Sequence, residues 1–167
     1  MVWACFTGES LGSLIVCDDV GIGADKYEDI IYDELFSLIN DLLELPEDLG
    51  TIQVATENTY LFMEDNAPCH KVTEVLEFLR EYHVPVMKWS PQSADLNPIK
   101  NLWFAFKECF HKRYIKMFNH PSKSLETRYR YGKVLQEVWY SQGQELVDTL
   151  IESMSRRVQA MIEANGS

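Results

Sequence analysis

The chain has 167 residues, a net charge of −11, 46% hydrophobic residues and 25% charged residues, which is typical of one globular domain. No apolar run approaches the roughly 20 residues of a membrane helix, and the N-terminus lacks the basic start of a signal peptide. The four cysteines stand at irregular spacings, which predicts reduced thiols rather than a disulfide framework or zinc site. We therefore expect an intracellular protein without a membrane partner.

Hydrophobic periodicity predicts a mixed α/β order of elements. Two β-rich runs, 2–7 and 12–17, flank a turn at 8–10 and predict a hairpin. Apolar residues at helical spacing predict five helices, over 24–45, 71–82, 99–118, 124–140 and 144–164. Short apolar runs predict further strands at 60–64 and 84–89, and the polar stretch 47–59 is expected to be a loop.

Two of these helices carry clear apolar stripes that predict how they pack. The helix over 99–118 places seven such residues on one side: Ile99, Leu102, Trp103, Phe106, Phe110, Tyr114 and Met117. The last helix has an expected inner face of Leu146, Leu150, Met154, Val158 and Met161. The helix over 99–118 is expected to dock on the sheet through its stripe.

Charge is unevenly distributed along the chain. Residues 1–70 hold fifteen acids and one basic residue, Lys26, whereas residues 71–167 hold fourteen basic residues and eleven acids. Between 100 and 133, two acids stand against nine basic residues: Lys100, Lys107, Lys112, Arg113, Lys116, Lys123, Arg128, Arg130 and Lys133. Two interpretations stay open. These are solvated helix faces, or they form a phosphate-contacting surface with Trp103, Phe104, Tyr129 and Tyr131 interleaved for stacking.

Two linked motifs are more specific than the composition. In the first, Leu-Phe-Met-Glu-Asp-Asn-Ala-Pro-Cys-His over 61–70, an apolar run ends in Asp65 and Asn66, and His70 follows. This pattern predicts a buried strand that delivers a carboxylate at the end where α/β sheets place their chemistry. The second, Trp-Ser-Pro-Gln-Ser-Ala-Asp-Leu-Asn-Pro-Ile-Lys-Asn-Leu-Trp over 89–103, predicts a turn and then a helix with Asn97 as N-cap and Pro98 at the first helical position.

Together the motifs closely resemble the catalytic domain of Tc1/mariner-type DDE transposases, in which three carboxylates hold two divalent metal ions. In that family, 34 residues separate the Asp of the Asp-Asn motif from a Glu or Asp. Here the same spacing from Asp65 leads to Lys100. Residues 2–16 resemble the second and third strands of the domain, and 153–160 its closing helix. The resemblance covers nearly all of 1–167, as a single truncated domain.

This resemblance implies a ribonuclease-H-like fold, with a mixed sheet flanked by helices. We expect it to lack its first, central strand, which carries the family's first catalytic Asp, and to lack the family's helix-turn-helix DNA-binding domain. Of the implied metal ligands only Asp65 is retained, because the ammonium group of Lys100 donates hydrogen bonds and does not ligate a cation. The family's Mg²⁺ is therefore expected to bind weakly or not at all, and Lys100 to point toward Asp65 and neutralise it.

The remaining polar residues of the motifs have simpler predicted roles. Glu64 is not expected to replace the missing ligand, because adjacent strand residues face opposite sides of a sheet. Asp95 belongs to the family's turn and is expected to form turn and cap hydrogen bonds. Asn66 and His70 match the family motif. For His70 we favour capping or packing over an acid–base role.

Three functions stay open. The first is a transposase-derived domain that has lost cleavage and is kept as a binding or assembly scaffold. The second is an active metal-dependent strand-cleaving and strand-transfer domain, completed by missing N-terminal residues or a second chain. The third is a non-catalytic nucleic-acid-binding module. DNA is expected as a weak, salt-sensitive partner, a second copy or partner protein is expected to complete the sheet, and the expected location is nuclear.

Overall fold

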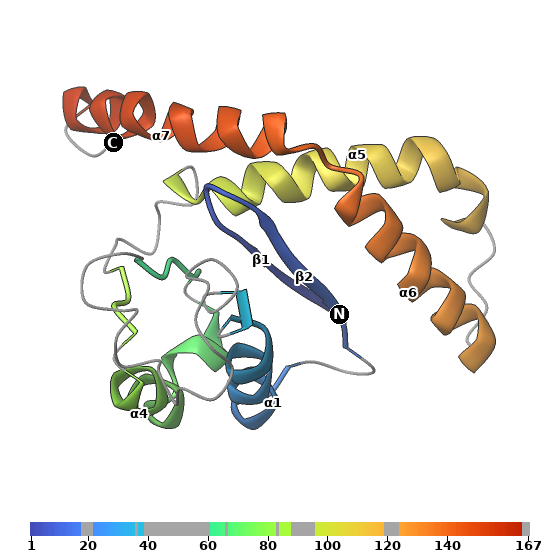
Figure 1. Ribbon diagram of the computed structural model, residues 1–167, viewed down its shortest axis with the longest axis horizontal. Coiled ribbons are helices and arrows are strands. Elements are labelled where there is room, and N and C mark those ends of the chain that lie inside the picture. The colour runs from blue at the N-terminus through green and yellow to red at the C-terminus, as the bar shows by residue number, and fades with distance from the viewer. Residues whose placement is uncertain are drawn as a thin grey trace. The chain divides into compact units, whose positions relative to one another are not determined.

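The computed structural model describes residues 1–17, 22–35, 37–38, 61–65, 67–82, 84–87, 96–118 and 124–164. The chain divides into two compact units (Figure 1). Unit 1 consists of Met1 and Cys17–Asn97, and unit 2 of Val2–Val16 and Pro98–Ser167. No helix in the described ranges is long and apolar enough to cross a membrane.

Unit 2 begins with the predicted hairpin. Strands β1 (Val2–Phe6) and β2 (Leu11–Val16) pair antiparallel, with Ala4 opposite Leu14. The turn closes through a hydrogen bond of 2.9 Å from the Thr7 amide to the Ser10 carbonyl oxygen. The Thr7 hydroxyl also accepts from the amides of Glu9 and Ser10, at 3.2 Å each, so a side chain supports the tight connection. Among the described residues, the sheet consists of these two strands.

Three helices complete unit 2: α5 (Pro98–Phe118), α6 (Leu125–Tyr140) and α7 (Gln144–Glu163). Their bounds agree with the sequence prediction to within one residue. Helix α6 starts where Ser124 caps it by accepting a hydrogen bond from the Thr127 amide. Helix α5 bends at Tyr114, whose φ of −129° and ψ of 27° are not helical.

One apolar core holds unit 2 together. The hairpin contributes Ala4 and Leu14, and the helices contribute Leu102, Phe106, Phe110, Val138, Trp139 and Leu150. The predicted stripe of α5 is therefore confirmed at its described buried positions. The predicted inner face of α7 is wrong at Val158, which is 39% exposed. The buried positions of α7 are Val147, Leu150 and Ser153, because its later turns run beyond the core.

Unit 1 is built on α1 (Ala24–Ile30), which continues into a π-helical turn, η1 (Ile31–Leu35), and on α4 (Thr73–Glu81). A short 3₁₀ turn, η2 (Pro68–Lys71), precedes α4. Buried side chains of these helices include Tyr27, Ile31, Val75 and Leu79. The helix predicted over 24–45 therefore runs with a change of pitch to residue 35, and residues 37–38 are also helical. Residues 39–60, with the predicted loop, lie outside the described ranges.

Among the described residues, the two strands predicted at 60–64 and 84–89 are represented by one parallel bridge, between Phe62 and Val86. The Phe62 amide donates to the Pro85 carbonyl oxygen and the Met87 amide to the Phe62 carbonyl oxygen, both at 2.8 Å. The neighbouring residues 63–65 belong to no strand. Within the described part, the architecture is mixed α/β with one two-stranded sheet and five α-helices.

Candidate functional site

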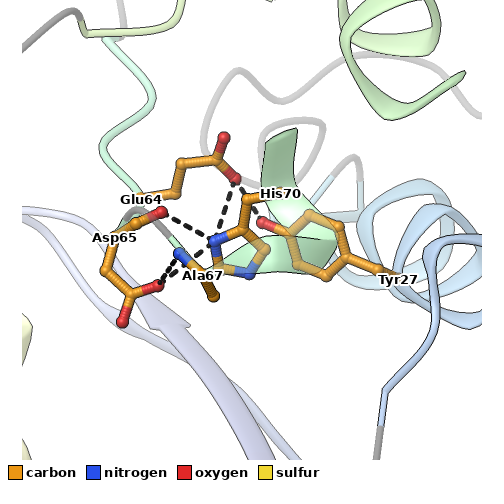
Figure 2. A network of polar contacts seen from close by, with 5 residues as sticks. All are labelled: Tyr27, Glu64, Asp65, Ala67 and His70. Atoms are coloured by element: carbon orange, nitrogen blue, oxygen red, sulfur yellow. Dashed lines mark hydrogen bonds and ion pairs between the residues drawn. The ribbon is translucent and has the colours of Figure 1, made fainter. Parts of the chain in front are cut away.

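Asp65 lies in a polar cluster of unit 1 that Figure 2 shows together with Tyr27, Glu64, Ala67 and His70. The local sequence explains how Asp65 is held. Its Oδ1 accepts a hydrogen bond of 3.1 Å from the Ala67 amide two residues on, a turn that Asp side chains favour. Pro68 then starts the η2 turn, with φ preset for a helical first position. This turn brings His70 back over Asp65.

His70 contacts both acids of the motif through one nitrogen. Its Nδ1 lies 2.8 Å from the Asp65 carbonyl oxygen, 3.2 Å from Asp65 Oδ1 and 3.7 Å from Glu64 Oε2. The imidazole also stacks on the ring of Tyr27, with centroids 4.2 Å apart. These contacts fix the imidazole between α1 and the Asp65 turn, and a packing role for His70 stays our prediction.

Glu64 departs from its predicted place. Strand alternation predicts that its side chain faces away from that of Asp65, yet both carboxylates reach His70 Nδ1. The physical reason is that residues 63–65 form no strand, so a side-chain period of two does not apply. The Tyr27 hydroxyl donates a hydrogen bond of 2.5 Å to Glu64 Oε2. No local signal in the sequence connects these two residues, because they are 37 positions apart.

Burial dominates the electrostatics of this pair. It raises the pKa of Glu64, whose side chain is only 11% exposed; the hydrogen bond from Tyr27 and the nearby His70 oppose this shift, and Asp65 adds to it. Burial, followed by the charge of Glu64, also raises the pKa of Tyr27. Tyr27 therefore stays protonated and serves as the donor.

The described residues do not fit a two-metal site. Mg²⁺ prefers several oxygen ligands in near-octahedral geometry, and the family resemblance predicts the ammonium group of Lys100 in place of the third ligand. Within the described ranges, no group of three or more His, Cys, Asp and Glu side chains is placed to hold a metal ion. Asp65 Oδ1 is already engaged by Ala67 and His70.

The second motif places its residues at the start of α5. The helix begins at Pro98, as predicted, and Asn97 directly before it is 2% exposed. Lys100, in the first turn, is exposed. Asp65 belongs to unit 1 and Lys100 to unit 2, so their proximity stays a prediction. Asn66 and Asp95 lie outside the described residues.

Most of the predicted phosphate-contacting residues are exposed on α5 and α6: Lys100, Lys107, Lys112, Arg113, Arg128, Arg130 and Lys133. Lys123 and the side chain of Lys116 lie outside the described part. Lys112 forms an ion pair of 3.2 Å with Glu108, and Arg113 donates to the Ser141 hydroxyl at 3.2 Å.

The interleaved aromatic residues divide into two groups. Trp103 and Tyr131 pack against the core of unit 2, whereas Phe104 and Tyr129 are 69% and 64% exposed. Lys133 Nζ lies 4.6 Å from the centroid of the Tyr129 ring. The sequence pattern alone does not separate these groups.

Comparison with known proteins finds related transposases. No family model matches the chain. The Tcb2 transposase of Caenorhabditis briggsae is 32% identical over 166 residues, and the Tc1 transposase of Caenorhabditis elegans 30% identical over 168 residues; each alignment covers 99% of this chain and 52% of the relative. The chain is a homologue of the Tc1/mariner transposases. It spans about half the length of these curated relatives.

Solved structures of related fold agree with this similarity. The Mos1 transposase catalytic domain with Raltegravir and Mg has a TM-score of 0.69 at 18% identity, covering 99% of this chain and 74% of that chain. The crystal structure of the catalytic domain of Mos1 mariner transposase has a TM-score of 0.67, with coverage of 99% and 72%. The predicted ribonuclease-H-like fold of this Tc1/mariner homologue is thereby confirmed. The absence of the first strand stays a prediction.

Proposed function

We propose that this Tc1/mariner homologue is a transposase-derived domain that does not cleave DNA and that acts as a binding or assembly scaffold. The observation that carries the proposal is Lys100. It stands where the family resemblance puts the third carboxylate, 34 residues beyond Asp65, and it is exposed in the first turn of α5.

The chemistry supports this proposal. Two-metal phosphoryl transfer polarises the attacking and leaving oxygens with two cations about 3.5–4 Å apart, held by carboxylates. A lysine at a ligand position adds a positive charge where the site must attract two divalent cations. It also removes the oxygen that would bind them.

A cleavage assay tests the proposal. We expect no nicking of supercoiled plasmid and no strand transfer from terminal-repeat duplexes with Mg²⁺ or Mn²⁺. Metal-dependent nicking that Asp65→Ala abolishes, and that the exposed-site control Glu74→Ala retains, would overturn the proposal and favour the active enzyme. Restoring the acid by Lys100→Glu is expected to raise Mn²⁺ affinity in calorimetric titrations without producing cleavage, because the family mechanism needs three carboxylates.

A second candidate function is sequence-independent binding of nucleic acid, which would give the scaffold a DNA partner and a nuclear location. The supporting observation is the set of exposed basic side chains on α5 and α6, including Lys107, Lys112 and Arg113. Neutralising these three by Gln is expected to weaken binding of a 30-base-pair duplex. It should also lower the salt slope by roughly 0.9 per lost phosphate contact. The control is Lys26→Gln, at an exposed position of α1 in unit 1; an equal loss of duplex binding in both variants would contradict this function.

A further inference from the structure

Phe104 is exposed without a role in the core. It is 69% exposed, more than any other large apolar side chain in the described part of the chain. The buried side of the same helix is formed by Leu102, Phe106 and Phe110, which belong to the core of unit 2. An aromatic ring of this size in water lowers neither the free energy of the core nor that of the helix. A single exposed apolar side chain is common on protein surfaces, so the case for a ligand depends on the residues that surround this ring.

Two lysines stand beside this ring. Lys100 is four residues before Phe104 and Lys107 three residues after it, so they are its neighbours one turn away on either side of the same helix face. Both are exposed. The helix is regular here, since its only non-helical residue is Tyr114. The arrangement is a flat π surface with a cation on each side.

Helix α5 contains one acid, Glu108, and that acid forms an ion pair. Glu108 is four residues after Phe104 and would otherwise repel an anion. Its Oε2 forms an ion pair of 3.2 Å with Lys112 Nζ, on the side of the helix away from Lys107. Within four residues of Phe104, α5 therefore carries two lysines and one ion-paired acid, although the whole chain carries −11.

We propose that Phe104, with Lys100 and Lys107, is a stacking site for an unpaired base of single-stranded nucleic acid. The inference rests on the nucleic-acid-binding function proposed above. A base stacks on the ring while the phosphates on either side of it meet the two lysines. Stacking of this kind tolerates any base, because every base has a π face. It favours single strands, because the bases of a duplex are stacked on each other.

Of the four aromatic residues in this basic segment, Phe104 is the one suited to the task. Trp103 and Tyr131 are committed to the core of unit 2. Tyr129 is exposed, but Lys133 lies over its ring at 4.6 Å and occupies a face that a base would need. The site is therefore on α5, and the sequence pattern alone does not single it out.

The test distinguishes base stacking on Phe104 from phosphate contacts by comparing two ligands, one with bases and one without. Fluorescence anisotropy compares a labelled 15-residue oligothymidine with an abasic 15-mer, which has the same phosphates and no bases. We expect tighter binding of the oligothymidine. Phe104→Ala should weaken that binding roughly 5- to 100-fold, leave the abasic 15-mer unaffected and leave the salt slope unchanged. Phe104→Trp should retain tight binding.

Charge variants and a matched apolar control complete the design. Lys100→Gln and Lys107→Gln should each lower the salt slope by about 0.7 for both ligands. Ile115→Ala removes another exposed apolar side chain of α5 that has no π surface, and it should change neither affinity.

The outcomes are distinguishable. Equal affinity for the abasic and base-bearing strands, or an unaltered oligothymidine affinity in Phe104→Ala, overturns the stacking site and leaves nucleic-acid binding intact. Binding of no oligonucleotide or duplex overturns both proposals. Tighter binding of duplex than of single strand also contradicts the stacking site. Parallel titrations with oligouridine show whether single-stranded DNA or RNA is preferred. Either result supports the site if Phe104→Ala weakens binding of the preferred strand.

Discussion

The indole N–H of Trp139 donates a buried hydrogen bond of 2.8 Å to the Gly12 carbonyl oxygen, joining α6 to β2 across 127 positions. Gln136 makes a second such bond, of 3.1 Å, to the Leu14 carbonyl oxygen. In an antiparallel pair, alternate residues turn their backbone groups away from the partner strand. Side chains of α6 thus satisfy carbonyl groups that β1 does not reach, and α6 closes that edge of the hairpin.

We predict that Trp139→Phe lowers the free energy of unfolding by about 2–4 kcal/mol, because the Gly12 carbonyl loses its donor in a buried place and the core loses volume. Gln136→Ala is the comparison, since its bond is only partly buried, and it should cost less than about 1 kcal/mol. Urea denaturation followed by circular dichroism measures both. Equal losses of unfolding free energy in the two variants would mean that the buried hydrogen bond contributes no more to stability than the partly buried one.

Glu64 is predicted to make stability depend on pH. Its pKa is raised above 4.5 in the folded chain, mainly by burial, so folding takes up a proton between pH 4.5 and the folded pKa. Its contribution to stability is therefore present below pH 4.5 and is lost as the pH rises through the folded value. The melting temperature of Glu64→Gln, relative to the unmodified chain, should rise from pH 4.5 to 7. A difference that is constant with pH would contradict this prediction.

The predicted pairing of Lys100 with Asp65 can be measured as a coupling energy. Asp65 is 41% exposed and Lys100 is exposed, so we expect a coupling of about 0.2–1 kcal/mol rather than that of a buried pair. The double-mutant cycle uses Asp65→Asn and Lys100→Met, with unfolding free energy as the readout. A cycle with Lys107→Met, three residues after Phe104 on the same helix, is the control. Coupling of the same size in both cycles would argue against a specific pair.

Self-association is a further prediction. Side chains of α6 satisfy carbonyl groups of β2, and the sheet of the described residues has β1 as its other strand. A strand at the edge of a sheet favours pairing with another chain, and a symmetric dimer is the commonest way for identical chains to cover such a surface. Light scattering at micromolar concentration should therefore give a mass above that of one chain, 19.4 kDa. A monodisperse monomer would refute the prediction.

Local periodicity was sufficient for the helices of unit 2 and for the hairpin. Their bounds follow from apolar spacing and end signals such as Ser124 and Pro98, and those signals act within a few residues. The strands predicted in unit 1 were less secure, because a short apolar run does not specify its partner. Around Phe62 the structure has a single bridge, and the alternation inferred for Glu64 therefore failed.

The sequence by itself determined the motif residues, their spacing and the lysine at position 100, since these are properties of the covalent order. Only the tertiary structure decided that Tyr27 meets Glu64 across 37 positions, because no local pattern encodes a contact between distant segments. It also decided that Trp103 is packed against the core while its neighbour Phe104 is in solvent. Two adjacent residues of one helix differ by about 100° around its axis, and which direction is buried depends on the elements that pack against the helix.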